Sequence, residues 1–420
     1  MAKNIKDMVE RQASAAKSAA IDAAILSEST RIEILHAMAD AINAGRNSIK
    51  EANNHDVNDS REIGLPEPMV DRLILDDRRI DGMINGLREV ANLPDKIGHV
   101  TAMRKRPNGL LVGKMIVPLG CIAIIYESRP NVTADAAGLC IKSGNTIILR
   151  GGSEAINSNR EITKIISKAA ESAGFPSGGI QFIDTTDRAA VDVLLSLRTY
   201  IDVLIPRGGA KFIQKVVENA KVNVIETGAG NCHAYIDKEA DLAMAAEIVY
   251  NGKVSRPSVC NATKKVLMHV ANAHEFLRII IPRLKKAGVK ILAGKKAAKY
   301  LPDERAMTEE ELYEEFLDMR LGFIVVDSLQ SAIKHVNKYS SHHTETIVTN
   351  NYKRAMRFIN AVDSASLFWN ASTRFTDGGE FGMGAEIGIS TQKIHARGPM
   401  SVQELTTTKF VTLGTGQIRE

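Results

Sequence analysis

Short apolar segments alternate with stretches of helical periodicity over most of this chain, and this alternation limits the possible folds most strongly. A first series has apolar segments at 122–126, 146–149, 180–183, 201–205 and 222–225. A second series has them at 233–236, 265–268, 289–292, 323–326, 345–348 and 366–369. Short apolar strands joined by helices predict mostly parallel sheets covered by helices on both faces. With 420 residues, the chain is expected to form two such doubly wound α/β domains.

The region before the first series is predicted to be helical, from residue 1 to about 60 and again from about 66 to 92. Thr30 and Glu33 have the spacing of a capping box at the start of one of these helices. Gly45 is suited to the C-cap at its end.

The sequence becomes strand-like at 100–118, where Asn108-Gly109 is a strong signal for a two-residue hairpin turn. A hairpin has two open edges, which pair either with another subunit or with the hairpin's own domain. The residues leave both alternatives open. Together with the β-prone tail at 406–413, the hairpin indicates an oligomer. The glycine-rich stretch 373–398 is predicted to be irregular, and loops of this length often belong to sites.

Composition excludes several functions. The net charge is only +5 and no run of five Lys or Arg occurs, so no nucleic-acid partner is expected. No apolar run is long enough to span a membrane, and the N-terminus lacks the apolar region of a signal peptide. The four cysteines, at 121, 140, 232 and 260, have no CxxC or metal-ligand spacing. They are interpreted as reduced thiols of a cytoplasmic protein without a metal.

Two loops between strands and helices carry both glycine and arginine, Arg150-Gly151-Gly152-Ser153 and Arg207-Gly208-Gly209. Backbone N–H groups at such loops and at helix N-termini bind anions, and arginine suits phosphate. Neither loop matches the GxGxxG or P-loop patterns. Each is either a plain tight turn or part of a site for a phosphate-bearing cofactor, and their occurrence on one sheet edge favours the cofactor.

The segment 251–262, with the sequence NGKVSRPSVCNA, holds the best candidate for a nucleophile. Cys260 follows Arg256 by four residues, and a thiol attacks only as thiolate, which a positive or hydrogen-bond-donating neighbourhood stabilises. The alternative is a buried structural cysteine. The residues alone do not separate these interpretations.

Several motifs resemble those of the aldehyde dehydrogenase family, in that family's order along nearly the whole chain. The segment ending at Cys260 resembles the family's cysteine motif, and ETGAG, from Glu226, resembles its ELGG motif. Further matches are PLGCIAIIYESRPN at 118–131, GNTIILR at 144–150, EEFL at 314–317 and LFWNASTRFTDGGEFG at 367–382. The resemblance implies two Rossmann-like domains and a β-hairpin oligomerisation flap. The implied boundaries are 1–99 and 119–227 for cofactor binding, 228–390 for catalysis, and 100–118 with 391–420 for oligomerisation.

Finer motifs resemble the gamma-glutamyl phosphate reductase branch of that family. They are YESRPNVT, SRPSVCNA and the long segment FTDGGEFGMGAEIGISTQKIHARGPM. Three departures from general aldehyde dehydrogenases accompany them. Pro257-Ser258 replaces a Gly-Gln pair before the cysteine, Arg129-Pro130-Asn131 replaces Pro-Trp-Asn, and Arg150 stands at the position of the cofactor lysine. The departures fit a branch that acts on acyl phosphates.

This resemblance implies the NADPH-dependent reduction of L-glutamyl 5-phosphate to L-glutamate 5-semialdehyde, the second step of proline biosynthesis from glutamate. Cys260 would be the nucleophile that expels phosphate and forms a thioester. The Asn131 amide and the backbone N–H of Cys260 would be the oxyanion donors. Glu226 stands where oxidising relatives have a general base. In a reductase, it would shuttle a proton or help to bind the cofactor.

The resemblance also places binding residues. Arg150 and Ser153 suit an adenosine 2′-phosphate, Gly208 and Gly209 the pyrophosphate, and Glu315 the nicotinamide ribose. Arg129, Arg256, Arg374, Arg397 and His395 are candidates for the substrate's anionic groups, although each is also a typical surface residue.

A homo-oligomer is expected, and contact with glutamate 5-kinase is plausible because the acyl phosphate is labile. Two alternatives remain: a cysteine-dependent semialdehyde or acyl-CoA dehydrogenase of the same fold, and a non-enzymatic interaction protein that keeps the scaffold. The RPN and HARGP stretches argue against the first alternative. The combination of Cys260, Asn131 and Glu226 argues against the second.

Overall fold

The computed structural model describes residues 2–127 and 129–419, which form two compact units. Unit 1 comprises residues 1–226, 382–388 and 400–420, and unit 2 comprises residues 227–381 and 389–399. The chain passes from unit 1 to unit 2 between Glu226 and Thr227. The roles that the sequence analysis assigned to its domains remain predictions.

The sheet of unit 1 is four-stranded and parallel, in the order β5-β4-β3-β6. All six residues of β3 are buried, and alternate residues Cys121, Ala123 and Ile125 belong to one hydrophobic cluster with residues of α1 and α8. The chain leaves β3 first toward β4 and later returns to its other side as β6, which is the switch point of a doubly wound sheet. Its elements are β3 (Cys121–Tyr126), α6 (Asn131–Lys142), β4 (Thr146–Arg150), η1 (Ser153–Ala155), α7 (Ile156–Ser172), β5 (Ile180–Phe182), α8 (Ala189–Ser196), β6 (Val203–Arg207) and α9 (Ala210–Asn219).

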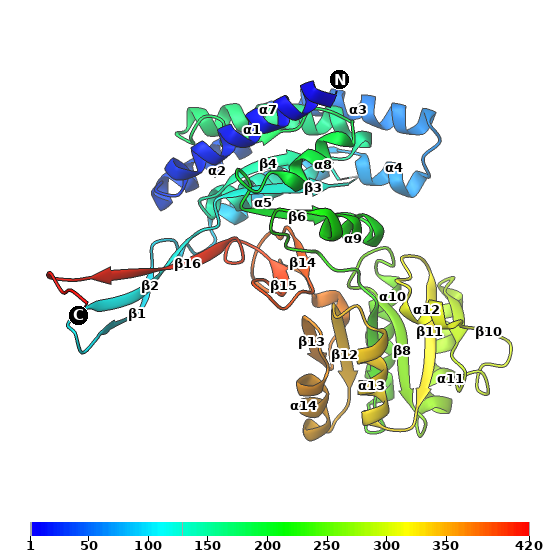
Figure 1. The fold of residues 1–420 in the computed structure, drawn as a ribbon. Coiled ribbons are helices and arrows are strands. Elements are labelled where there is room, and N and C mark those ends of the chain that lie inside the picture. The colour runs from blue at the N-terminus through cyan, green and yellow to red at the C-terminus, as the bar shows by residue number, and fades with distance from the viewer. Residues whose placement is uncertain (1, 128, 420) are drawn as a thin grey trace. The chain divides into compact units, whose positions relative to one another are not determined.

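Helices from the N-terminal region cover both faces of this sheet (Figure 1). Helix α1 packs against α8, β4 and β5, whereas α2 packs against α5, α6 and α7 on the other face. These helices are α1 (Ala2–Ala23), α2 (Glu28–Ala44), α3 (Arg46–Glu62), α4 (Glu67–Leu73) and α5 (Asp77–Ala91). The helical prediction for this region is therefore confirmed.

Two local predictions are wrong. The N-cap of α2 is Ser27, whose hydroxyl accepts the Thr30 N–H at 3.1 Å, so Thr30 lies inside the first turn and is not the cap. Gly45 does form the predicted C-cap.

The predicted strand at 222–225 is only an isolated bridge between Leu204 and Val224, because the backbone keeps hydrogen-bonding distance to β6 only around Leu204.

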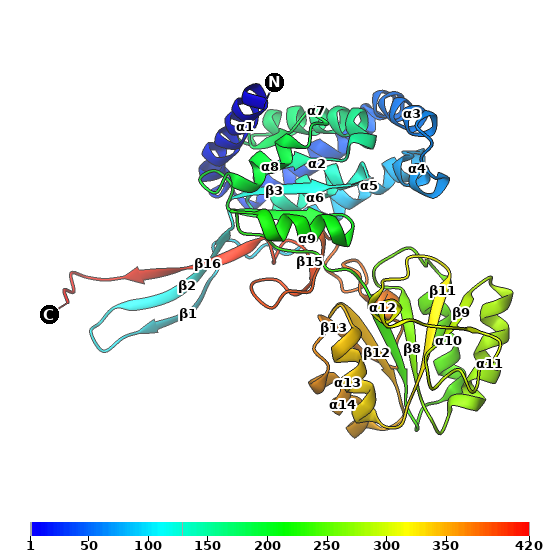
Figure 2. The same ribbon diagram turned by 45° about the vertical axis from the view of Figure 1, so that its right-hand side comes forward.

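The hairpin at 100–118 forms, and its own C-terminal tail completes a three-stranded antiparallel sheet (Figure 2). Strand β16 (Thr406–Leu413) pairs with β2 (Leu111–Pro118) over its whole length, while β1 (Val100–Lys105) flanks β2 on the other side. Gly109 takes a φ of +86° in the turn, a conformation that glycine adopts readily. In the described chain, the outer edge of β1 pairs with no strand.

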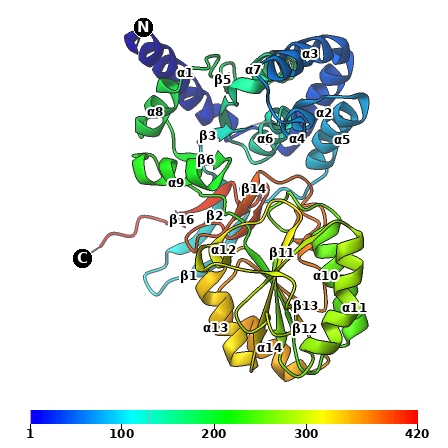
Figure 3. The same ribbon diagram turned by 90° about the vertical axis from the view of Figure 1, so that its right-hand side faces the viewer.

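The sheet of unit 2 is seven-stranded and parallel, in the order β10-β9-β11-β8-β7-β12-β13. Figure 3 shows α10 and α11 on one face and α13 and α14 on the other, and a separate hydrophobic cluster fills each side. The elements are β7 (Cys232–Ile236), α10 (Leu242–Val254), β8 (Thr263–His269), α11 (Ala273–Lys286), β9 (Lys290–Ala293), β10 (Arg305–Ala306), α12 (Glu309–Tyr313), β11 (Arg320–Val326), α13 (Leu329–Tyr339), β12 (Thr344–Val348), α14 (Tyr352–Ala361), β13 (Ser366–Trp369) and η2 (Thr373–Phe375).

The glycine-rich stretch after η2 contains little regular structure, as predicted. It forms only β14 (Gly388–Ser390), which pairs with β15 (Gly398–Met400) in a two-stranded sheet. Within unit 2, Ser390 makes an isolated antiparallel bridge with Thr227.

Candidate active site

Cys260 lies in the connection between α10 and β8, and its exposure sets it apart from the other cysteines. Cys121, Cys140 and Cys232 are buried, whereas Cys260 is half-exposed. It precedes β8 by three residues, so it lies at the amino ends of the strands.

A buried lysine donates hydrogen bonds to the backbone of the loop that carries Cys260. Lys264 Nζ donates to the carbonyl oxygens of Val259, at 2.7 Å, and Cys260, at 2.6 Å. The Cys232 thiol also donates to the Cys260 oxygen, at 3.2 Å. Burial raises the pKa of Cys232 well above its ordinary value, so this thiol acts as a neutral donor. The loop is thus held in one conformation by side chains that the sequence analysis had not assigned to it.

Gly230 packs directly against the backbone of the same loop. A β-carbon at this position would lie 1.8 Å from the Cys260 carbonyl oxygen and 2.7 Å from its α-carbon, so only glycine fits. The Gly230 N–H donates to Glu315 Oε1 at 2.7 Å, and this carboxylate lies 4.0 Å from Lys264 Nζ. Glu315 was predicted to contact a nicotinamide ribose. In the structure it contacts Gly230 and Lys264, which both pack against the loop of Cys260.

Two of the predicted substrate arginines lie beside Cys260. Burial lowers the pKa of Arg374, and the charge of the neighbouring Arg256 lowers it further, whereas the nearby Cys260 opposes this effect. Arg374 donates to the side chain of Asn261, and its Nε donates to Ser255 Oγ at 3.2 Å. Arg256 itself is exposed. The structure thus places the charge of Arg374 near the candidate nucleophile and near Arg256, an arrangement suited to anions.

The two C-terminal candidates differ in their surroundings. Arg397 forms an ion pair with Asp363 at 2.7 Å, and Lys393 pairs with the same carboxylate at 2.8 Å. The hydrogen bond from Lys393, followed by that from Arg397, lowers the pKa of Asp363 to about 2. His395 lies between them in sequence, is exposed, and has a φ of +71°. Arg397 thus has a carboxylate partner already, whereas the His395 ring lies at the surface.

Asn131, Arg129 and Glu226 belong to unit 1. Asn131 is the first residue of α6, and its amide donates to Asp135 Oδ2 at 2.8 Å. Burial raises the pKa of Asp135 to about 6, although this hydrogen bond opposes the shift. Arg129 and Glu226 are both half-buried. Because these residues and Cys260 lie in different units, the predicted pairing of Asn131 with Cys260 remains a prediction.

A cavity of about 600 Å³ in unit 1 contains two of the predicted cofactor residues, Arg150 and Ser153. It opens at the carboxyl ends of β3 and β4, as expected for a doubly wound sheet. Arg150 is buried and donates to the Gly151 and Thr186 carbonyls, and burial lowers its pKa. Its Nε has no partner among the described residues.

The same cavity is lined by charged residues that the sequence analysis missed, which are Glu127, Glu154, Arg188, Asp192, Lys211 and Lys215. Most follow a strand end directly or lie in the first turns of the next helix, a position that signals a ligand site in parallel sheets. Gly209 is the N-cap of α9, and its N–H donates to Glu127 Oε2 at 3.1 Å. Gly208 lies so close that a β-carbon there would be 2.6 Å from that carboxylate.

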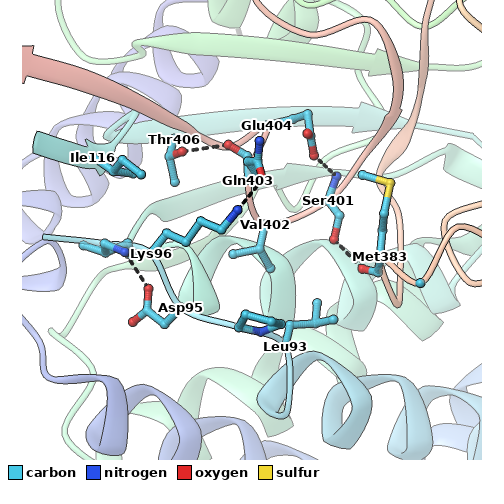
Figure 4. Close-up of a pocket in the computed structure, with 13 residues that line it drawn as sticks. Leu93, Asp95, Lys96, Ile116, Met383, Ser401, Val402, Gln403, Glu404 and Thr406 are labelled. Carbon is cyan, nitrogen blue, oxygen red and sulfur yellow. Dashed lines mark hydrogen bonds between the residues drawn. The ribbon is translucent and has the colours of Figure 1, made fainter. Parts of the chain in front are cut away.

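A second cavity of unit 1, of about 180 Å³, contains none of the predicted residues (Figure 4). It lies where the chain enters the three-stranded sheet, and Lys96 Nζ donates to Gln403 Oε1 across it at 3.1 Å. Ser401 is held by Glu404, which accepts its N–H at 2.9 Å.

Among residues 2–127 and 129–419, no three or more His, Cys, Asp or Glu side chains lie together so that they could hold a metal ion. Within the same residues, no helix has the length and apolar character that a membrane crossing requires.

The chain is similar in sequence to known proteins of one enzyme family. Residues 1–294 match the model of the aldehyde dehydrogenase family. A gamma-glutamyl phosphate reductase of Thermoanaerobacter pseudethanolicus is 52% identical over 412 residues, which cover 98% of this chain and 100% of the relative. One of Clostridium novyi is 53% identical over 416 residues, covering 99% and 100%.

Solved structures give the same result. The crystal structure of gamma-glutamyl phosphate reductase from Thermotoga maritima is 44% identical and superposes with a TM-score of 0.95, covering 98% of this chain and 100% of that one. An acetylating aldehyde dehydrogenase from Geobacillus thermoglucosidasius, at 18% identity and a TM-score of 0.72 over 100% and 99% of the chains, shares the fold.

Proposed function

The chain belongs to the aldehyde dehydrogenase family and, within it, to the gamma-glutamyl phosphate reductases, and we propose from this membership that it reduces L-glutamyl 5-phosphate to L-glutamate 5-semialdehyde with release of phosphate. This reaction is the second step of proline biosynthesis from glutamate. The observation that carries the proposal is the full-length identity of 52% to an enzyme of that name, together with a half-exposed cysteine held rigidly at the predicted position.

Cys260 acts as the nucleophile. Its thiolate attacks the acyl carbon, a carbon–sulfur bond forms, and phosphate leaves with the electron pair of the broken carbon–oxygen bond. The acyl phosphate brings its own good leaving group, so this step needs little acid help. Arg374 and Arg256 support it, because positive charge near the sulfur favours a phosphorylated substrate.

The negative charge that develops on the acyl oxygen needs donors. We assign this role to the backbone N–H of Cys260 and to the side-chain amide of Asn131. Asn131 has a second amide hydrogen besides the one it donates to Asp135, so it retains a donor for substrate.

The cavity of about 600 Å³ fits an anionic dinucleotide, which we propose to be NADPH. Arg150, Arg188, Lys211 and Lys215 supply positive charge there, and the buried Nε of Arg150 lacks a protein partner. Arg150 and Ser153 would hold the 2′-phosphate, and Gly208 and Gly209 would face the pyrophosphate. When bound, the cofactor would supply a hydride to the thioester carbonyl. Glu315 stays assigned to the nicotinamide ribose, in addition to its contact with Gly230.

The remaining polar residues complete the assignment. Glu226 returns a proton to the released thiolate or helps to bind the cofactor. Arg129, Arg256, Arg374 and His395 are assigned to the phosphate and the α-carboxylate of the substrate. No metal is assigned a role in the reaction.

The molecule would work in the cytoplasm as a homo-oligomer, and glutamate 5-kinase, which makes the labile acyl phosphate, is its proposed partner. Two observations support this setting. All four cysteines are free thiols, as in reducing compartments, and the three-stranded sheet presents an open edge in the described chain.

The test is the reverse reaction. Glutamate semialdehyde, inorganic phosphate and NADP are expected to yield NADPH, and omitting phosphate should stop it. Simple aldehydes, or coenzyme A in place of phosphate, should support less than about one hundredth of the rate, because the arginines beside Cys260 recognise anions. Cys260→Ala should abolish turnover. Full turnover of that variant, or a preference for coenzyme A, would contradict the proposal and favour a dehydrogenase of another branch.

A further inference from the structure

We propose that Lys264 is a positioning residue that aims the backbone N–H of Cys260 at the acyl oxygen of the substrate. The proposal rests on the proposed function only in that it takes Cys260 as the nucleophile and its N–H as an oxyanion donor. Lys264 has no place in the motifs of the sequence, and its role follows from contacts within unit 2.

The direction of the N–H follows from peptide geometry. Lys264 is buried, and its Nζ lies 2.7 Å from the Val259 carbonyl oxygen. That carbonyl and the Cys260 N–H belong to the same peptide group, and no cis peptide occurs in the described chain. In a planar trans peptide the two bonds point in opposite directions. Drawing the carbonyl inward to Lys264 therefore turns the N–H outward.

The second contact of Lys264 prevents this peptide from rotating. Nζ also lies 2.6 Å from the Cys260 oxygen, so consecutive carbonyls on both sides of the nucleophile meet one buried donor. Among the described residues, the Cys260 N–H itself has no protein acceptor, which leaves it available for a ligand. Donation to the carbonyl of a peptide also polarises that peptide and strengthens its N–H as a donor.

Neighbouring groups keep Lys264 itself in place. Glu315 lies 4.0 Å from its Nζ and is anchored by the Gly230 N–H at 2.7 Å. Lys253, which is also fully buried, instead directs its Nζ to the Phe316 carbonyl at 3.4 Å. Lys253 therefore offers a matched control, since its removal takes a buried lysine from the same region without freeing the cysteine loop.

The test compares two reactions of the same sulfur. p-Nitrophenyl acetate acylates a thiolate through a tetrahedral oxyanion and releases p-nitrophenolate. Iodoacetamide alkylates the thiolate at a saturated carbon, where iodide leaves and no oxyanion forms. A donor aimed at the oxyanion accelerates only the first reaction. The ratio of the acylation burst to the alkylation rate thus isolates the N–H from the reactivity of the thiol.

Lys264→Met is expected to slow the acylation burst by roughly 30- to 100-fold and alkylation by less than about 3-fold. In the reductive reaction it should lower kcat by a similar factor and leave KM within about 3-fold, because the donor acts in the transition state. Lys264→Arg, which keeps a donor, should regain part of the burst. Lys253→Met should leave both rates within about 3-fold, since it does not touch the loop.

Three outcomes would overturn the proposal: an unchanged burst in a folded Lys264→Met protein, equal losses of burst and alkylation, or an equal loss in Lys253→Met. If thermal unfolding shows that Lys264→Met does not fold, Lys264→Gln takes its place in the same ratio measurement. The same measurements distinguish failure of this proposal from failure of the proposed function. A wild-type protein with a normal burst but no phosphate-dependent turnover would contradict the assigned substrate alone. A burst that survives in Cys260→Ala would contradict the nucleophile.

Discussion

Buried ionisable side chains are concentrated behind the cysteine loop in unit 2. Lys253 and Lys265 are fully buried, and burial lowers the pKa of each to about 7. Lys265 Nζ lies 3.8 Å from the centre of the Phe316 ring and donates to Asn231 Oδ1 at 2.8 Å. On the other strands, Glu345 accepts the His233 N–H at 2.6 Å within a buried cluster that includes His335 and His343. Such groups link stability to pH.

Glu345 gives a pH dependence with a defined sign. Burial raises its pKa to about 8, so between the unfolded value and pH 8 the folded chain holds a proton that the unfolded chain releases. The contribution of Glu345 to stability therefore falls as pH rises toward 8. Burial lowers the pKa of His233, which acts in the opposite direction below its ordinary value near 6.5. The lowered pKa values of Lys253 and Lys265 also act in the opposite direction, above pH 7, so the effect of Glu345 is isolated by comparing the wild type with a Glu345 variant.

The unfolding free energy of the wild type relative to Glu345→Gln is therefore expected to decline by about 1–2 kcal/mol between pH 6.5 and 9. At pH 6.5 the two proteins should differ by less than about 1 kcal/mol, because the amide oxygen can accept the His233 N–H as the protonated carboxyl does. Urea unfolding at several pH values measures both quantities. Parallel pH profiles of the variant and the wild type would contradict a protonated Glu345.

Arg150 gives a second prediction at this scale. Arg150→Ala should raise the KM for NADPH by roughly 10- to 100-fold and that for NADH by much less, because only NADPH carries a 2′-phosphate. Steady-state kinetics with both cofactors measures this difference. Arg160→Ala is the control, since Arg160 is exposed and pairs with Asp184 outside the cavity. An equal increase in KM for both cofactors would mean that Arg150 only maintains the shape of the cavity and does not bind the 2′-phosphate.

At the scale of elements, α7 depends on a cap from a different helix. Its N-cap residue, Ala155, has no side-chain acceptor. Asp56 of α3 fills this role, because its carboxylate accepts the Asn157 N–H at 3.1 Å and the Ser158 N–H at 2.7 Å. The Ser158 hydroxyl donates to it as well, at 2.5 Å. The N-terminal helices are thereby connected to the helix that follows the loop at 150–153.

Asp56→Ala should lower the unfolding free energy of the protein by about 2–4 kcal/mol, since it leaves several buried donors of α7 without an acceptor. Urea unfolding followed by circular dichroism measures this loss. Asp59→Ala is the matched control, because Asp59 is exposed on the same helix, and it should change stability by less than about 0.5 kcal/mol. A loss of similar size in both variants would mean that the cap contributes little.

At the scale of the whole molecule, the three-stranded sheet is the strongest indication of assembly. Most of its residues are exposed, among them Phe410 on β16 and Met103 on β1. Exposed apolar side chains on a small sheet with an open edge are typical of a subunit interface.

Deleting 406–420 should lower the oligomeric state, because it removes β16 and leaves the edge of β2 without its partner. Light scattering measures the assembly size. Deleting only 415–420 is the control, since it keeps β16, and it should leave the assembly intact. An unchanged size after the longer deletion would mean that the sheet is not the interface.

The sequence by itself determined the order and type of most elements and the family of the chain. Strands buried on both faces, such as β3, are uniformly apolar, and that composition is a local property. The Asn108-Gly109 turn and the motif around Cys260 are likewise contained in a few adjacent residues. The predictions of a hairpin at 100–118 and of the aldehyde dehydrogenase fold are confirmed, although three residues, 107–109, form the turn instead of the predicted two. The role of Cys260 stays a prediction.

Only the tertiary structure decided which groups contact the loop of the candidate nucleophile. Lys264, Gly230 and Cys232 reach the Cys260 carbonyl from different strands and loops. Gly230 ends the ETGAG motif and Lys264 follows Cys260 by four residues, but neither position reveals the contact. A buried lysine differs from a surface lysine only in what surrounds it. The prediction of a strand at 222–225 was wrong for the same reason. A strand forms only where a partner strand lies alongside it, and the sequence of the segment does not show whether one does. Periodicity is local to the chain, whereas burial and pairing arise when remote segments pack together.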